Sequence, residues 1–141
     1  MRRRSLAVLL VVPALAGCGA SSSSNNAKDF KGDQKAVAQT IDDFSSAVRN
    51  NDEKKICTDL LSRSLVTRLD ATAQKCTGAV ADQLDAAGDT KLDVKTVSVT
   101  GTRATATVVS KVDGHDRTQT LSLVSENGDW RLSGASNGLA G

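Results

Sequence analysis

The 141-residue sequence predicts an α+β fold, in which three N-terminal helices pack on a curved, four-stranded antiparallel meander. Up to about residue 88, apolar residues recur at spacings of three and four, as on one face of a helix. Beyond residue 91, segments rich in Val, Thr and Leu alternate with glycine-containing turns, which is typical of β-hairpins. This change of period predicts that the helices come first and the sheet second.

The first 17 residues predict an export signal rather than a part of the folded domain. Arginines 2–4 form a basic start, and an apolar run follows from Leu6 to Leu15. This run is too short to cross a bilayer as a helix, which takes about 20 residues. Arg3 and Arg4 also fit, more loosely, a twin-arginine export signal, so the export route stays open.

Leu15, Ala16, Gly17 and Cys18 resemble the lipobox of bacterial lipoprotein precursors at all four positions. The resemblance implies a diacylglycerol on the Cys18 sulfur, cleavage before Cys18, and anchoring to the extracytoplasmic face of the cell membrane. Two or more acyl chains hold a protein durably at a membrane, whereas one holds it weakly. The alternative is a secreted or uncleaved soluble protein with a buried cysteine.

Residues 18–31 are expected to join the lipid to a domain at 32–135, and residues 136–141 form a short tail. Residues 19–28 are rich in Ser and Asn, which predicts a flexible tether. Cleavage would remove three arginines and no acidic residue, leaving 15 basic and 16 acidic residues. The mature chain then has no excess positive charge, which argues against nucleic acid as a partner.

Residues 33–50 predict the first helix, with Asp33 as its N-terminal cap. Four apolar residues recur along one face of this helix: Val37, Ile41, Phe44 and Val48. Asp52 is expected to cap a short second helix that runs to about Leu61.

A third helix is expected from Thr72 to Ala87, with Gly88 as its C-terminal stop. Residues 62–71, between the second and third helices, suggest only a helical turn packed on the core.

Four strands are predicted in the C-terminal part: 92–100, 103–112, 117–125 and 130–133. The turns between them fall at Gly101, Asp113-Gly114 and Asn127-Gly128. The buried phase of the first strand shifts between Val94 and Val97, which predicts a β-bulge near Thr96.

Two segments of the domain are distinctive: Ile-Cys-Thr-Asp-Leu-Leu-Ser at 56–62 and Glu-Asn-Gly-Asp-Trp-Arg-Leu at 126–132. With the first helix and the cysteine-bearing third helix, they resemble the NTF2-like (cystatin-like α+β) superfamily over residues 30–135, most closely its small actinobacterial lipoproteins. The resemblance implies a sheet wrapped around the helices as a cone with an apolar mouth. About ten residues separate the second and third helices, too few for the extra hairpin of many members.

Cys57 and Cys76 are the two other cysteines. Export would place them in an oxidising compartment, where an even pair predicts a disulfide. A loop of about 20 residues closed in this way contributes about 3 kcal/mol to stability. Free buried thiols are the alternative, because two cysteines and one distant histidine make a poor metal site. We expect no metal and no cofactor.

The sequence predicts a protein without enzymatic activity. Catalytic members of the NTF2-like superfamily place Asp, Tyr or His inside the cone, whereas this chain has no tyrosine and its one histidine, His115, lies in a predicted turn. Asp42 and Asp43 are neighbours on a helix and point about 100° apart, so they are not expected to share a proton.

Binding is therefore the favoured function: an interaction module that contacts another envelope protein, or a second copy of this chain through the sheet. The alternative is a carrier or sensor of a small apolar ligand or lipid in the cone. An isomerase- or dehydratase-like enzyme is the third hypothesis, and it needs an inward Asp or His. The residues expected to line a ligand pocket are Val97, Val99, Val108, Leu121, Leu123 and Trp130.

Overall fold

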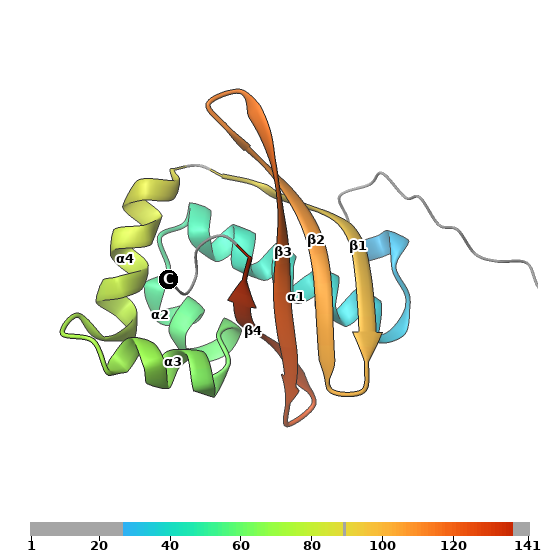
Figure 1. The fold of residues 1–141 in the computed structure, drawn as a ribbon, viewed down its shortest axis with the longest axis horizontal. Coiled ribbons are helices and arrows are strands. Elements are labelled where there is room, and N and C mark those ends of the chain that lie inside the picture. Colours follow the sequence, from blue (N-terminus) through green and yellow to red (C-terminus); the bar gives the residue numbers. More distant parts are fainter. Residues whose placement is uncertain (1–26, 89, 137–141) are drawn as a thin grey trace, which may run out of the picture.

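The computed structural model describes residues 27–88 and 90–136, and within these ranges every helix precedes every strand (Figure 1). The helical elements are a 3₁₀ turn (Ala27–Asp29), α1 (Gly32–Arg49), α2 (Glu53–Lys55), a π-helical turn (Ile56–Leu60), α3 (Arg63–Asp70) and α4 (Lys75–Ala87). The strands are β1 (Leu92–Thr100), β2 (Arg103–Val112), β3 (His115–Glu126) and β4 (Asp129–Ala135). The predicted α+β class is confirmed.

The four strands form one open antiparallel sheet in the order β1-β2-β3-β4, as expected for a meander. The β2–β3 and β3–β4 turns each have positive φ at both central residues, Asp113-Gly114 and Asn127-Gly128. Two-residue hairpin loops require this backbone, and Asp-Gly and Asn-Gly adopt it readily. The predicted bulge in β1 is confirmed, because the register shifts between Val94 and Thr96.

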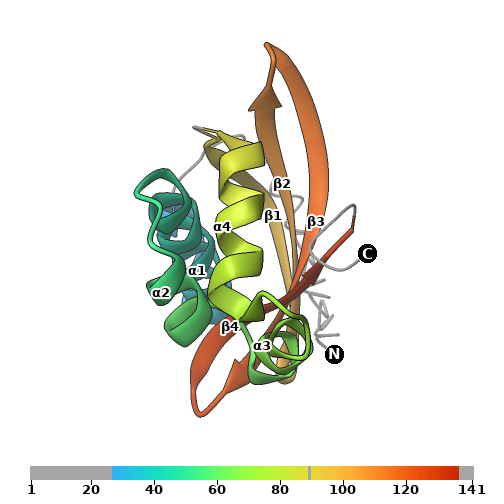
Figure 2. The same cartoon turned by 90° about the vertical axis from the view of Figure 1, so that its left-hand side faces the viewer.

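The core lies between the helices and one face of the sheet, and Figure 2 shows the helices gathered on that face. Along β2, Ala104, Ala106 and Val108 are buried, whereas Thr105 between them is exposed. This alternation is the period of a strand with one solvated face. The other face of the sheet carries exposed Thr and Ser side chains, such as Ser98, Thr105 and Thr118.

The number of helices differs from the prediction. Residues 62–71 contain a complete helix, α3, where only a helical turn was expected. The described ranges thus hold four α-helices in place of three. The side chain of Ser62 caps α3 by accepting a hydrogen bond from the Leu65 backbone N–H at 3.3 Å. A backbone hydrogen bond from Ser62 to Leu132 (2.8 Å) fixes the start of α3 against β4.

Several element boundaries also differ. Lys31 occupies the N-cap position of α1 and makes no side-chain capping bond, so the predicted role of Asp33 is wrong. Helix α4 begins at Lys75 rather than Thr72, and in its first turn the Cys76 N–H donates to the Asp70 carboxylate at 2.9 Å. Strands β3 and β4 extend beyond 117–125 and 130–133. Their pairing continues up to the hairpin turns, and at its other end β4 pairs through Ala135, opposite Leu121.

Two predicted helix ends are confirmed. The side chain of Asp52 accepts a hydrogen bond from the Lys55 backbone N–H at 3.0 Å and so caps α2. Gly88 has a φ of 61° and donates its N–H to the Leu84 carbonyl, so α4 ends at the glycine that can adopt this backbone.

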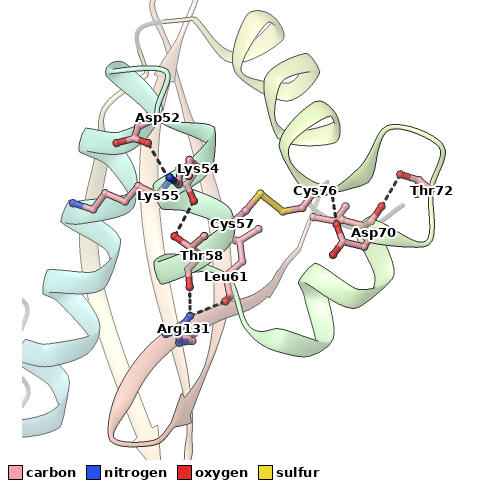
Figure 3. The surroundings of a disulfide bond; sticks show 11 residues. Asp52, Lys54, Lys55, Cys57, Thr58, Leu61, Asp70, Thr72, Cys76 and Arg131 are labelled. Atoms are coloured by element: carbon pink, nitrogen blue, oxygen red, sulfur yellow. Dashed lines mark hydrogen bonds between the residues drawn. A yellow bond between two sulfur atoms is a disulfide. The ribbon is translucent and has the colours of Figure 1, made fainter.

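The predicted disulfide between Cys57 and Cys76 is present (Figure 3). Cys57 lies in the π-helical turn and Cys76 in the first turn of α4, and their Cα atoms are 6.1 Å apart. Both side chains belong to the buried core. The bond therefore ties the π-helical turn to α4 rather than joining two regular helices.

Candidate functional site

The candidate site is an apolar hollow between α4 and the sheet, which we call the α4 cleft. It has a volume of about 280 Å³ and opens to solvent at the C-terminal ends of α1 and α4. Its lining residues come from α1, α4, the connection between α4 and β1, and all four strands: Phe44, Val48, Gln83, Leu84, Ala86, Ala87, Thr90, Leu92, Ser110, Val112, Gln119, Leu121 and Ala135.

The cleft exists because the sheet is longer than the helices that cover it. Strands β2 and β3 continue past the end of α4 as a hairpin arm, which projects from the body in Figure 1. Leu92 and Val112 face the helix side near this end and remain half-buried. The lining residues Ala86, Ala87 and Ala135 are too small to fill the remaining space. Apolar surface is therefore left uncovered where the helices stop.

A few polar groups border the apolar lining. Gln83 on α4 and Gln119 on β3 line the cleft, and within the described residues their side-chain amides have no hydrogen-bond partner. The backbone N–H of the lining residue Leu92 donates to the buried Ser45 hydroxyl of α1 at 3.2 Å. Binding sites commonly combine an apolar wall with a small number of such polar groups.

A second hollow, the α1–β4 groove, is polar and has a volume of about 480 Å³. Its lining mixes charges of both signs: Asp43, Lys55, Asp59, Asp129 and Arg131. At its base the Thr40 hydroxyl donates to the Trp130 carbonyl at 3.2 Å. Within the described part of the chain, no cluster of three metal-binding side chains occurs. The lining of this groove is therefore mainly polar and charged, in contrast to that of the α4 cleft.

Of the six residues expected to line a pocket, one lines the α4 cleft and another lines the α1–β4 groove. Leu121 lines the α4 cleft, and Trp130 lines the α1–β4 groove while only 8% exposed. Val97, Val108 and Leu123 are buried in the core, and Val99 packs against it half-buried.

The helical side of the cleft was not predicted from the sequence. Phe44 was expected only on the apolar face of the first helix, and Gln83, Ala86 and Ala87 had no expected role. The run of small residues at the end of α4, next to Gly88, was the available signal, because small side chains leave space beneath a helix end.

The titratable groups singled out from the sequence lie outside the α4 cleft. Asp42 is half-buried on α1, and burial raises its pKa above the ordinary value, against the opposing effect of a hydrogen bond from the Ala27 backbone. Asp43 lines the α1–β4 groove and Asp42 does not, so the two adjacent carboxylates have different surroundings. His115 is exposed at the tip of the β2–β3 arm. None of these three titratable residues lines the cleft.

Cys18 lies outside the described residues. In the ranges that the structure describes, no helix is long and apolar enough to cross a membrane. The chain matches no protein-family model and is not significantly similar to any curated protein.

Proposed function

We propose that this protein is a lipid-anchored, extracytoplasmic interaction module, and that the α4 cleft receives an apolar group of another envelope protein. The lipid anchor rests on the lipobox-like residues that end at Cys18. The domain would be an NTF2-like one, whose cone mouth corresponds to the α4 cleft. Binding is favoured over catalysis because the cleft lining holds amides and hydroxyls but no acid, base or thiol.

The size and openness of the cleft support a protein partner. Pockets that enclose a small molecule usually have volumes of about 300–1,000 Å³ and bury most of the ligand. The α4 cleft, at about 280 Å³, lies just below this range and is open to solvent. It has room for one or two apolar side chains of a partner. A carrier of a small apolar ligand is the second candidate, supported by the same apolar wall.

Replacement of Cys18 by alanine tests the anchor. Because the sulfur would carry the diacylglycerol, Cys18→Ala should move the protein from the membrane pellet to the soluble exported fraction. Immunoblots of fractionated cells provide the measurement. A variant that stays in the pellet would show that the protein is not held by a lipid on Cys18.

Filling the α4 cleft tests the binding site. A photoreactive amino acid at Gln83 is expected to cross-link the protein, in intact cells, to an envelope partner. Ala87→Phe should abolish this cross-link, because the new ring occupies the cleft. Thr77→Phe is the matched control, since Thr77 is exposed on α4 outside the cleft lining. Equal cross-linking in both variants would contradict the proposal, and a small apolar molecule released from the purified protein by organic solvent would favour the carrier.

A further inference from the structure

The α1–β4 groove is lined by charged side chains that have no partner within the described structure. Asp43 of α1, Lys55 of α2 and Asp59 of the π-helical turn are exposed there, together with Asp129 of β4. Among the described residues, none of these four side chains forms an ion pair or a hydrogen bond. Their charges are therefore available to a ligand.

Arg131, the fifth charged residue of the lining, is already engaged. Its guanidinium donates to the Thr58 carbonyl at 2.7 Å and lies 3.9 Å from the Glu126 carboxylate. Figure 3 shows the Lys55 side chain reaching toward α1, the helix that carries Asp43. In the described lining, the groove thus offers a ligand one ammonium group and three carboxylates.

Trp130 adds a hydrogen-bond donor to the groove. It is only 8% exposed, and its indole N–H has no hydrogen-bond partner among the described residues, although a buried tryptophan usually finds one. Within the same residues, Asp93 Oδ1 is the only buried side-chain polar atom that lacks both a hydrogen-bond partner and access to solvent. The indole N–H therefore reaches solvent, and the α1–β4 groove is the described hollow that Trp130 lines.

We propose that the α1–β4 groove binds a small zwitterion with a second ammonium group, that is, a diamino acid. The carboxylate of the ligand would accept from the Lys55 ammonium and the Trp130 indole N–H, and its two ammonium groups would donate to carboxylates of the lining. The groove and the α4 cleft share no lining residue, so this inference goes beyond the proposed function and does not depend on it.

The spacing of the charges favours this ligand over a metal ion. In the described part of the chain, no three acidic side chains lie close enough together to hold a metal, so the carboxylates are spread along the groove. Spread carboxylates suit separate ammonium groups. The volume of about 480 Å³ also lies within the range of about 300–1,000 Å³ that is usual for small-molecule sites.

A neutral sugar fits the groove less well. Trp130 is nearly buried, so little of its ring is open for a sugar to stack on. A neutral ligand would also leave charges of both signs without a counter-charge.

The test uses the full chain, labelled with ¹⁵N, at fixed ionic strength, with L-lysine as the probe. Trp130 is the one tryptophan of the sequence, so its indole N–H gives a single NMR signal. Added lysine should shift this signal saturably. Norleucine lacks the second ammonium group and 1,5-diaminopentane lacks the carboxylate, so each should bind about two- to fivefold more weakly, as for the loss of one exposed ion pair. No saturable shift with lysine, or equal binding of all three compounds, would overturn the proposal.

Two charge-removing variants locate the contacts. Lys55→Met should weaken lysine binding about two- to fivefold without weakening that of 1,5-diaminopentane, because only the carboxylate contacts Lys55. Lys54→Met is the matched control, since Lys54 is exposed next to it but outside the lining. Asp129→Asn should weaken the binding of both compounds, with Asp85→Asn on the exposed side of α4 as its control. If each variant equals its control, the attraction is a general charge effect and the groove is not a site.

The α4 cleft provides a last control. Ala87→Phe, which fills that cleft, should leave lysine binding unchanged, and Lys55→Met should leave the Gln83 cross-link unchanged. Loss of lysine binding in Ala87→Phe would show that the groove is not the binding site. The inference and the proposed function can therefore fail separately.

Discussion

At the scale of single residues, Arg131 shows how one side chain of the last hairpin orders the helical part. Its guanidinium donates to the Thr58 carbonyl at 2.7 Å and, less closely, to the Leu61 carbonyl at 3.5 Å. These carbonyls lie at the end of the π-helical turn, where a positive charge is favourable. The carboxylate of Glu126, 3.9 Å from Arg131, also accepts from the Arg63 N–H at the start of α3. Glu126 and Arg131 therefore link β3 and β4 to two helical segments.

The disulfide is the second residue-scale link, and its removal should destabilise the domain. Replacing both Cys57 and Cys76 by alanine should lower the free energy of unfolding by about 3 kcal/mol. The cross-link between residues 19 positions apart would then no longer restrict the unfolded chain. Urea unfolding followed by circular dichroism provides the measurement. Reducing agent should lower the stability of the wild type but not of the double variant. A wild type that is insensitive to reduction would indicate that this loop does not limit the unfolded state.

At the scale of elements, tertiary contacts contribute more to the formation of α3 than its own sequence does. Its eight residues contain one fully buried side chain, Leu65. Isolated helices of this length are marginal in water. The cap by Ser62 and the hydrogen bond from Ser62 to Leu132 supply what the local sequence lacks. For this reason the sequence suggested only a turn where the structure has a helix.

Loss of the Ser62 cap should therefore be measurable. Ser62→Ala should reduce the free energy of unfolding by about 1–2 kcal/mol, because the Leu65 N–H would lose its buried acceptor. Ser64→Ala is the control, since Ser64 is exposed and its hydroxyl contacts only Ser62 in the described structure. Equal losses in both variants would show that the Ser62 hydroxyl does not act as a cap.

At the scale of the whole molecule, the helices and the sheet share one hydrophobic core. Leu132 of β4 is fully buried, and it forms an isolated parallel bridge with Leu61 just before α3. Residues from α1, α4 and all four strands belong to the same buried cluster. The two halves of the chain should therefore unfold together.

Leu132→Ala tests this coupling. The substitution should cost about 3 kcal/mol, from lost burial and the cavity left behind. Far-UV circular dichroism and Trp130 fluorescence should show one coincident transition at a lower denaturant concentration. The conservative variant Leu132→Met should lose much less. Separate transitions for the two signals would show that the helical part folds independently of the sheet.

The features that depend on neighbouring residues could be predicted from the sequence alone. Apolar spacing predicted α1, and the Asp-Gly and Asn-Gly pairs predicted both tight hairpins, because backbone sterics at those residues are local. The disulfide was also predicted, from the number of cysteines and the expected export of the chain.

The position of the α4 cleft depends on the tertiary structure. The cleft arises from a difference in length, because β2 and β3 extend beyond the end of α4. Such mismatches depend on how distant segments pack, and no local pattern encodes them. The alternating pattern of the strands correctly predicted that Val97, Val108 and Leu123 face the helices. The same pattern is expected for a filled core and for an open pocket, so it does not distinguish them. The helix end that stops short of the strands determines which of the two is formed.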